Sequence, residues 1–450
     1  MTKTDVRELC LGILLEVTGQ KEFSHVALRN VLDKYQYLEK QERAFLTRVT
    51  EGTLERMLEL DHIINQFSKV KVNKMKPVIR NILRMSVYQI KYMDSVPDSA
   101  VCNEAVKLAK KKGFSSLSGF VNGVLRSIVR GLGEVQYPPK SRVAEHLSVR
   151  YSMPQWLTER WLAAYGRELT EEMLEGFLQA TDTTVRIHTG RTAPAELKEQ
   201  LEAEGIETAE VQGLPYALRI RKFDSLKRIP AFREGLFSVQ DISSMLVAEA
   251  ADPKEGDFCL DVCAAPGGKA THLAEKLNGT GLVEARDLTD YKVRLMEENI
   301  ERSGLTNIRT KVFDATRPDE AMMAQADVVL ADLPCSGLGV LGKKPDIKYR
   351  ATPESLVSLA GLQRQILGTI WQYVKPGGTL VYSTCTINPE ENEENVRWFL
   401  QKYPFEPAEL PEVLGAFAGE ESRKSGMCQL LPGKQGNDGF FIAKLRRKDK

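Results

Sequence analysis

From about residue 236 onward, short apolar runs alternate with segments of helical periodicity, and this alternation constrains the fold more than any other feature. The apolar runs lie at 258–262, 281–286, 308–312, 328–331, 379–382 and 440–445. Most of the early runs end in a glycine-rich or acidic turn that leads toward a helical segment. Because each helix must cover a face of the sheet, this pattern predicts a doubly wound, largely parallel, Rossmann-like α/β sheet.

The first 140 residues show a different pattern. Between about 4 and 132, apolar residues return every three or four positions, which predicts six or seven helices. Breaks are expected at Gly19, 96–97, 112–113 and 131–139, where glycine and proline interrupt the pattern. Residues 141–235 mix two or three helices with short strands at 184–188 and 217–220, as in a small α+β domain. We therefore expect a multidomain chain with boundaries at 1–140, 141–235 and 236–450.

Composition excludes several classes of protein. With 450 residues, the chain is too long for one hydrophobic core, and it has no run of about 18 apolar residues that would span a membrane. Charged residues near the start replace the apolar stretch of a signal peptide. The seven cysteines form no CxxC pairs, which argues against a disulfide or zinc framework. We expect a cytoplasmic protein with no metal site.

The net charge of +1 conceals a basic front end. Residues 1–140 hold 23 Lys and Arg against 15 Asp and Glu. Within this region, six cations lie close together in the chain: Lys69, Lys71, Lys74, Lys76, Arg80 and Arg84. Such a run is typical of a surface that binds nucleic-acid phosphates, although a solvated helix face has the same composition.

The first strand of the α/β domain leads into a turn suited to a nucleotide-like ligand. The turn reads Asp261-Val262-Cys263-Ala264-Ala265-Pro266-Gly267-Gly268-Lys269, and a helix follows it. Small residues let the backbone approach a ligand, and the helix N-terminus offers free N–H groups. The GxxxxGK[ST] pattern is missing, which argues against a nucleoside triphosphate.

Two acidic residues complete a predicted adenosine site. Asp287 ends the second strand, where a carboxylate can bind ribose hydroxyls. Asp314 follows the third strand, where its side chain or backbone can meet an adenine. Either residue alone could be a helix cap or a turn residue, but together with the glycine turn they form a coherent site.

Two cysteines follow the fourth and fifth strands. Cys335 lies in Asp332-Leu333-Pro334-Cys335-Ser336-Gly337, and Cys385 lies in the segment 383–393, which reads STCTINPEENE. Both turns should lie at the carboxyl edge of the sheet, and neighbouring strands are about 4.8 Å apart, so both sulfurs can reach one substrate. A free cysteine is more often a small buried hydrophobe. We expect that structural role for the other five, Cys10, Cys102, Cys259, Cys263 and Cys428.

These motifs resemble those of a known enzyme family. CAAPGGK at 263–269, DLPCSG at 332–337 and STCTINPEENE at 383–393 are similar to the signature motifs of the RNA cytosine-5 methyltransferases of the NOL1/NOP2/Sun family. The resemblance covers about 145–446. Residues 42–45, 60–64 and 120–126 of the helical front resemble the RNA-binding protein NusB. The pairing resembles the layout of a bacterial enzyme that methylates 16S ribosomal RNA.

The resemblance implies a function and a set of roles. It implies S-adenosyl-L-methionine as cofactor, Cys385 as the nucleophile that adds to carbon 6 of cytosine, and Cys335 as the group for product release. A protonated Asp332 would donate to N3 of the base. The implied cofactor-binding residues are Cys263, Ala264, Ala265, Pro266, Gly267, Gly268, Lys269, Asp287, Asp314 and Asp332. The implied partner is 16S ribosomal RNA or an early small-subunit assembly particle, with the enzyme acting as a monomer.

Some features leave alternatives open. A methyltransferase for exocyclic amines typically has an Asp/Asn-Pro-Pro-aromatic turn after the fourth strand, which DLPC does not match. A noncatalytic RNA-binding assembly or antitermination factor would leave the cofactor turn and both cysteines unexplained, and another RNA cytosine could be the target. Lys269 either senses the target base or its phosphate, or faces solvent. Arg286 departs from the family, since related sequences usually keep an apolar residue there.

Overall fold

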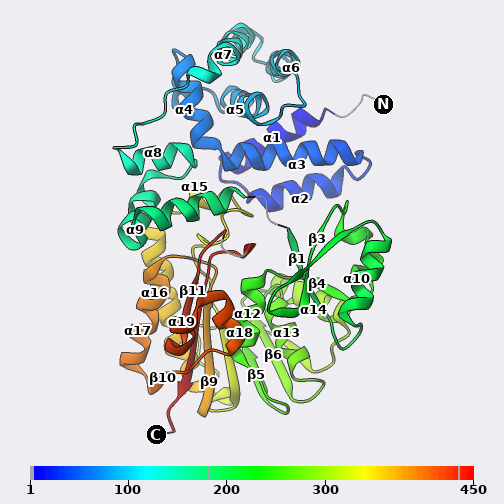
Figure 1. Ribbon diagram of the computed structural model, residues 1–450, viewed down its shortest axis with the longest axis vertical. Coiled ribbons are helices and arrows are strands. Elements are labelled where there is room, and N and C mark those ends of the chain that lie inside the picture. Colours follow the sequence, from blue (N-terminus) through cyan, green and yellow to red (C-terminus); the bar gives the residue numbers. More distant parts are fainter. Residues whose placement is uncertain (1–4, 180–181, 434–435, 450) are drawn as a thin grey trace. The chain divides into compact units, whose positions relative to one another are not determined.

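The computed structural model describes residues 5–179, 182–433 and 436–449, and the chain divides into two compact units. The helical unit comprises Met1–Leu178 and Leu341–Arg350, and the α/β unit comprises Gln179–Val340 and Ala351–Lys450. Figure 1 shows the elements of both units. This division does not coincide with the boundary expected near residue 140, so the three-domain division remains a prediction.

The helical unit contains seven helices in its first 132 described residues, in agreement with the periodicity of the sequence. Asp5 caps the first helix by accepting hydrogen bonds from the N–H groups of Arg7 and Glu8. Gly166, at φ +73°, interrupts the long helix α9. The helices are α1 (Val6–Thr18), α2 (Ser24–Lys34), α3 (Lys40–Glu55), α4 (Met57–Phe67), α5 (Pro77–Tyr92), α6 (Asp98–Lys111), α7 (Ser118–Gly131), α8 (Val143–Arg150), α9 (Gln155–Leu178) and α15 (Ile347–Arg350).

The core of the helical unit forms where the apolar stripes of its helices meet. Leu11, Leu46, Ile63 and Leu83, from four different helices, belong to one buried cluster. Gly52 of α3 lies against Tyr88 of α5, and a Cβ atom there would fall 2.0 Å from the tyrosine ring. The periodic apolar residues of the front region are therefore the residues that pack together.

The α/β unit begins with a small antiparallel sheet. Its strands are β1 (Thr183–Ile187), β2 (Glu207–Val211), β3 (Leu214–Arg221) and β4 (Phe237–Val239), in the order β2-β3-β1-β4. Helices α10 (Pro194–Ala203) and α11 (Pro230–Arg233) pack on the face that carries Val185 and Leu218. The sequence predicts β1 and β3, and the structure adds β2 and β4.

The large sheet contains all six strands that the sequence predicts. Its order is β10-β12-β9-β8-β5-β6-β7, with β11 paired to β12. Strands β5 to β9 run parallel, whereas β12 is antiparallel to β9, so the sheet is mixed. The strands are β5 (Phe258–Asp261), β6 (Leu282–Asp287), β7 (Ile308–Val312), β8 (Ala326–Asp332), β9 (Val374–Thr384), β10 (Phe405–Pro407), β11 (Met427–Leu430) and β12 (Phe440–Arg447).

Helices cover both faces of the large sheet (Figure 1). On one face lie α12 (Ile242–Ala251), α13 (Gly268–Lys276) and α14 (Asp290–Ser303), and on the other lie α16 (Pro353–Ile370) and α17 (Glu393–Lys402). The short helices α18 (Glu412–Ala418) and α19 (Glu420–Ser425) lie between β10 and β11 in the chain. Along β5, Cys259 and Leu260 point to opposite cores, which confirms the doubly wound fold. No helix in the described ranges is long and apolar enough to cross a bilayer.

Candidate active site

The carboxyl edge of the large sheet collects the predicted site residues. Asp261, Asp287 and Asp332 are the last residues of the parallel strands β5, β6 and β8, and Cys385 directly follows β9. Since neighbouring parallel strands end at the same edge, these groups come together although up to 124 positions separate them in the chain.

The glycine turn after β5 is held against the end of β6 by backbone hydrogen bonds. The N–H of Ala264 donates to the carbonyl of Arg286 at 2.8 Å, and that of Ala265 donates to Oδ2 of Asp287 at 3.1 Å. Gly267 has a φ of +101°, a conformation that favours glycine, and α13 begins at the next residue. The turn therefore presents the free N–H groups of a helix N-terminus, which suit acceptor groups of a ligand, beside a carboxylate that can accept hydrogen bonds from ribose hydroxyls.

Asp287 and Asp314 differ in their surroundings. Asp287 is buried, and its Oδ1 accepts from the N–H of Leu288 at 2.7 Å and contacts Nζ of Lys292 at 2.9 Å. Asp314 closes a turn, where hydrogen bonds from the hydroxyl and N–H of Thr316 lower the pKa of its carboxyl group. The N–H of Phe313 donates to the carbonyl of Asp287, which links the two regions.

Lys269 and Asp332 connect the glycine turn to the cysteine turns. Nζ of Lys269 lies 2.7 Å from Oδ2 of Asp332, and the hydroxyl of Ser383 donates to Oδ1 at 2.9 Å. Burial alone would lower the pKa of Lys269, but the neighbouring charges of Asp332 and Cys385 raise it above its ordinary value. Lys269 therefore pairs with Asp332 instead of extending freely into solvent, and its ammonium group lies within the electrostatic reach of the Cys385 thiol.

The sulfur atoms of Cys335 and Cys385 lie 3.3 Å apart. The hydrogen bond with Cys385, together with burial, raises the pKa of the Cys335 thiol well above its ordinary value. These surroundings therefore favour the protonated thiol form of Cys335. Cys10, Cys102, Cys259 and Cys428 are buried, as the sequence predicts, and burial raises the pKa of the partly exposed Cys263 thiol.

Glu391 ties the two cysteine turns together, a role that the motif does not reveal by itself. Its buried carboxylate accepts the N–H and the hydroxyl of Ser336 at 2.9 and 2.6 Å. It also accepts the side-chain amides of Gln363 and Asn388, both at 3.0 Å. Gln363 lies on α16, far from any motif, so the sequence offers no signal for it.

Two further ionisable residues near the glycine turn are buried. Burial and the nearby Asp332 raise the pKa of Asp261 to about 8, and its Oδ2 has no hydrogen-bond partner in the described part of the chain. Arg286 forms ion pairs with Glu284 and Asp319 and lies over the ring of Phe313, 4.6 Å from its centroid. The departure at Arg286 is thus accommodated by neighbouring acids and an aromatic ring.

The basic stretch of the helical unit separates into exposed and buried residues. Lys69, Lys71, Lys74 and Lys76 are exposed. Arg84, by contrast, is buried and forms two hydrogen bonds with the carboxylate of Asp61, at 2.7 and 2.6 Å. The lysines remain candidates for phosphate contacts, whereas Arg84 is occupied within the unit.

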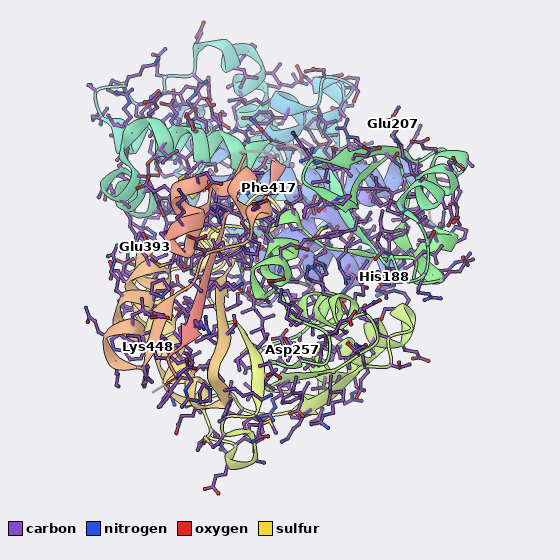
Figure 2. All side chains as sticks on the ribbon, turned by 60° about the horizontal axis from the view of Figure 1, so that its bottom comes forward. His188, Glu207, Asp257, Glu393, Phe417 and Lys448 are labelled. Atoms are coloured by element: carbon purple, nitrogen blue, oxygen red, sulfur yellow. The ribbon has the colours of Figure 1, made fainter. Side chains whose placement is uncertain are left out.

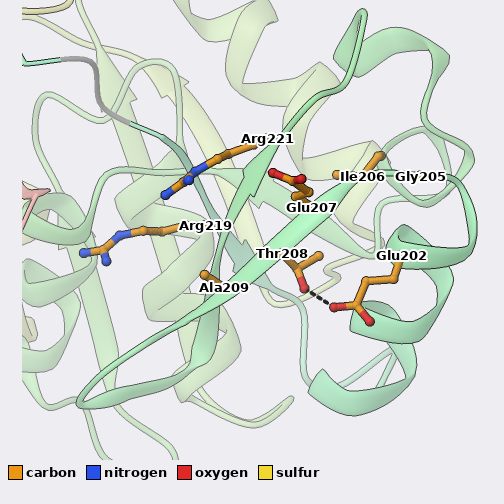
Figure 3. Close-up of a pocket in the computed structure, with 8 residues that line it drawn as sticks. All are labelled: Glu202, Gly205, Ile206, Glu207, Thr208, Ala209, Arg219 and Arg221. Carbon is orange, nitrogen blue, oxygen red and sulfur yellow. Dashed lines mark hydrogen bonds between the residues drawn. The ribbon is translucent and has the colours of Figure 1, made fainter.

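A hollow of about 470 Å³ lies along β2 and β3 of the small sheet (Figure 3). Its charged side chains are of both signs, and one of them, Arg221, forms an ion pair with Asp182. The hydroxyl of Thr208 donates to Glu202 at 2.6 Å. The residues of the cysteine and glycine turns are not among those that line this hollow, and RNA contact by the small domain remains a prediction.

The fold and the carboxyl-edge site define a class of protein, the S-adenosylmethionine-dependent methyltransferases. Comparison with known families narrows the class: residues 248–446 match the model described as 16S rRNA methyltransferase RsmB/F, 4–130 match the NusB family, and 153–226 match the ferredoxin-like domain of RsmF/B-like methyltransferases. The chain belongs to the RsmB/F family of methyltransferases, and its cofactor is S-adenosylmethionine. The resemblance seen in the motifs is thereby confirmed.

Individual relatives match all or most of the chain. The probable ribosomal RNA small subunit methyltransferase B of Bacillus subtilis (strain 168) is 39% identical over 455 residues, covering 100% of both chains. The crystal structure of PH0851 matches with a TM-score of 0.83 and 27% identity, over 99% of each chain. A methyltransferase homolog from Pyrococcus horikoshii matches 68% of this chain and 99% of its own, with a TM-score of 0.59 and 28% identity.

Proposed function

We propose that this protein methylates carbon 5 of a cytosine in 16S ribosomal RNA, with Cys385 as a covalent nucleophile. The observation that carries the proposal is the pair of sulfur atoms 3.3 Å apart at the carboxyl edge of the sheet, beside the cofactor turn. Transfer to an exocyclic amine requires no thiol, whereas carbon 5 requires one nucleophile and one base. The names of the family model and of the curated relatives support small-subunit ribosomal RNA as the substrate.

Cys385 activates the base. Carbon 5 of cytosine is too weak a nucleophile to take a methyl group directly, so the thiolate first forms a bond to carbon 6. The electron pair of the 5,6 double bond then becomes available at carbon 5. The ammonium group of Lys269 stabilises the thiolate form of Cys385 through its positive charge. S-adenosylmethionine supplies the electrophilic methyl group.

The pair formed by Lys269 and Asp332 controls the proton at N3. Addition at carbon 6 places negative charge on N3, and a hydrogen-bond donor there lowers the barrier. The ammonium group of Lys269 lies 2.7 Å from Oδ2 of Asp332, so Lys269 is the partner with which Asp332 can exchange a proton. In this proposal Asp332 receives a proton from Lys269 and donates it to N3 as carbon 6 is attacked. When the 5,6 double bond is restored, N3 gives the proton back to Asp332, which returns it to Lys269.

Cys335 completes the reaction. Once Cys385 is bonded to carbon 6, its sulfur no longer raises the pKa of Cys335, and Cys335 releases its proton to solvent. After methyl transfer, carbon 5 still carries its hydrogen, and the Cys335 thiolate takes it as a proton. The electron pair restores the 5,6 double bond while the bond between carbon 6 and sulfur breaks, so that Cys385 leaves as a thiolate. The remaining proposed roles concern the cofactor: the turn 263–269 and Asp332 face it, Asp287 accepts its ribose hydroxyls, and the Asp314 turn meets its adenine.

The two cysteines make an asymmetric test. With labelled S-adenosylmethionine and 16S ribosomal RNA, the wild-type chain should place label on carbon 5 of cytosine. Cys385→Ala should abolish incorporation, and Cys335→Ala should accumulate a covalent protein–RNA adduct that resists denaturation. Cys428→Ala, at a buried cysteine of the same unit, is the matched control and should retain activity. Free release of product by Cys335→Ala, without an adduct, would contradict the assignment.

The same assay separates the alternatives. Incorporation into an exocyclic amine, or into another RNA cytosine, would be visible when the label is mapped. No incorporation by any variant, with RNA binding retained, would favour a noncatalytic assembly or antitermination factor. The proposal includes a monomeric, cytoplasmic enzyme whose helical unit and small sheet bind RNA, either as free 16S RNA or within an early assembly particle.

A further inference from the structure

Residues 341–350, here called the clasp segment, follow the Cys335 turn in the chain but belong to the helical unit. They leave the α/β unit after Val340 and return to it at Ala351. The contacts of the clasp segment therefore require an explanation of their own.

Asp346 caps a helix that lies 322 residues away in the sequence. Its two carboxylate oxygens accept the N–H and the hydroxyl of Ser24, at 3.2 and 2.5 Å, where α2 begins. Both side chains are buried, and Asp346 is only 1% exposed. A carboxylate at a helix N-terminus satisfies free N–H groups and interacts favourably with the helix dipole.

Lys348 and Tyr349 bind the C-terminal end of a second helix, α3. Nζ of Lys348 donates to the carbonyl of Glu55 at 2.8 Å, and the hydroxyl of Tyr349 donates to that of Leu54 at 2.9 Å, both at the end of α3. The guanidinium of Arg350 lies 4.2 Å from the ring centroid of Phe23. The clasp segment thus places a carboxylate at the start of one helix, where it complements the helix dipole, and two hydrogen-bond donors at the end of another, where they satisfy free carbonyl groups.

Just before the clasp segment in the chain, Gly339 is attached to the turn that carries Cys385. The N–H of Gly339 donates to the backbone carbonyl of Cys385 at 3.0 Å, and its own carbonyl accepts from Gly439 at 2.9 Å. A Cβ atom at Gly339 would lie 1.9 Å from the Gly439 carbonyl oxygen, so the backbone is tightly held there. Six residues separate this anchor from Asp346, a stretch that spans at most about 25 Å when extended.

We propose that Asp346 is a positioning residue for the reaction, because it anchors the clasp segment and thereby links the helical unit to the Cys385 turn. RNA held by the helical unit is then presented at a defined chain distance from the thiol pair. The inference rests on the proposed function, since it assigns the clasp segment to alignment of the target base with Cys385. It predicts that loosening the link slows the covalent step without weakening cofactor binding or RNA binding.

The sharpest test lengthens the link and removes no contact. Insertion of Gly-Ser-Gly-Ser between Val340 and Leu341 of the full chain leaves both anchors intact. We expect kcat to fall by about tenfold or more, since misplacement of reacting groups by about 1 Å can cost 100-fold. KM for RNA, cofactor affinity and melting temperature should remain near wild type. The same insertion between Glu255 and Gly256, an exposed turn of the α/β unit, is the control.

A second variant breaks the anchor itself. Asp346→Asn should lower kcat in the same direction and increase hydrogen exchange at 341–350, whereas Asp94→Asn, at an exposed position of the helical unit, should change neither. Wild-type kcat in the insertion variant would overturn the inference even if label still reached carbon 5. Label on another atom in the wild type would instead overturn the proposed function, and the rates of the insertion and its control would still test the link.

Discussion

Helix α13 contributes one residue to each of two ion pairs in the α/β unit, and the two pairs differ in their exposure to solvent. At the start of α13, Lys269 contacts Asp332, with side chains 14% and 25% exposed. Further along the helix, Glu275 forms an ion pair with Arg186 of the small sheet, whose side chain is fully buried. Both members of the first pair are open to water and a substrate, whereas in the second the guanidinium is fully buried and only the Glu275 side chain is partly exposed, at 14%.

The buried region is a network. Arg186 donates to Oε1 of Gln240 at 2.7 Å and to the hydroxyl of Thr271 at 2.9 Å, in addition to its ion pair with Glu275. Burial and the nearby Arg186 lower the pKa of His188 to about 3, so this histidine stays neutral. In Figure 2, His188 lies inward of Glu207, which is exposed on β2 of the same sheet.

The difference in exposure indicates that one ion pair of α13 stabilises the fold, while the other can interact with a ligand. A buried charge cannot exchange its partner, because the group left behind would stay unpaired in a low-dielectric environment. An accessible pair can open toward a ligand at much lower cost. The network of Arg186 therefore holds α13 in place, and this leaves Lys269, at the start of the helix, in a reproducible position beside Asp332.

The largest expected effect is on stability, in the buried region. Arg186→Met would leave Glu275 without its partner, and breaking a buried ion pair typically costs about 3–5 kcal/mol. Denaturant unfolding of the full chain would measure the change. Arg221→Met, on β3, is the matched control because Arg221 is 59% exposed and pairs with Asp182 at the surface, where such pairs contribute at most about 1 kcal/mol. Equal losses in both variants would remove the distinction between the regions.

Asp261 should make the stability of the α/β unit depend on pH. The pKa of Asp261 is about 8 in the folded chain, mainly because of burial, against an ordinary value of 3.8. The folded state therefore holds a proton that the unfolded state releases between about pH 4 and 8, so the free energy of unfolding falls as pH rises through that range. Each unit of pKa shift corresponds to about 1.4 kcal/mol.

Asp261→Asn removes this titration. The variant should lose less stability than the wild type between pH 5 and pH 9, as measured by urea unfolding at each pH. Asp257→Asn, at the start of the same strand, controls for a carboxylate that lies at the opposite edge of the sheet. Parallel pH profiles for Asp261→Asn and wild type would show that Asp261 is ionised throughout.

Lys269→Met tests the accessible pair through the rate of reaction. The loss of the ammonium group removes the charge beside Cys385 and the partner of Asp332, and a positioned acid or base contributes about 100-fold or more. We expect kcat to fall by about 100-fold, while the free energy of unfolding changes far less than in Arg186→Met. Lys292→Met is the control, because Lys292 pairs with Asp287 but is 48% exposed. An unchanged kcat for Lys269→Met would remove Lys269 from the mechanism.

Much of the α/β unit follows from its sequence because strand ends are informative. Asp287, Asp332 and Cys385 each occupy the end of a parallel strand, and parallel strands deliver their ends to one edge regardless of separation in the chain. The short strands β2, β4, β10 and β11 were not predicted, since three to five residues with weak alternation look like loops. Their pairing depends on neighbours that the local sequence does not identify.

Long-range partners account for the rest of what could not be predicted. Gln363 binds Glu391, and Asp346 binds Ser24 across 322 residues, so neither role leaves a local pattern. Arg84 appears equivalent to its neighbouring lysines in the sequence, yet Asp61 pairs with it inside the helical unit. Exposure, which decides whether a charge is structural or available, is a property of the folded chain.

The contrast between buried and accessible charge also applies to the helical unit, where it predicts the smallest effect, a modest change in RNA binding. Lys71 and Lys74 are exposed and should contact RNA phosphates, so replacing both with Gln should weaken RNA binding modestly. Each lost phosphate contact should lower the slope of log K against log salt by about 0.7 to 0.9. Arg84→Gln should instead lower the melting temperature and leave the slope of log K against log salt unchanged, because Arg84 binds the carboxylate of Asp61. Point variants are preferable to removal of residues 1–140, which would also strip the clasp segment of its partners at α2 and α3. A salt slope that changed with Arg84→Gln but not with the lysines would reverse the assignment.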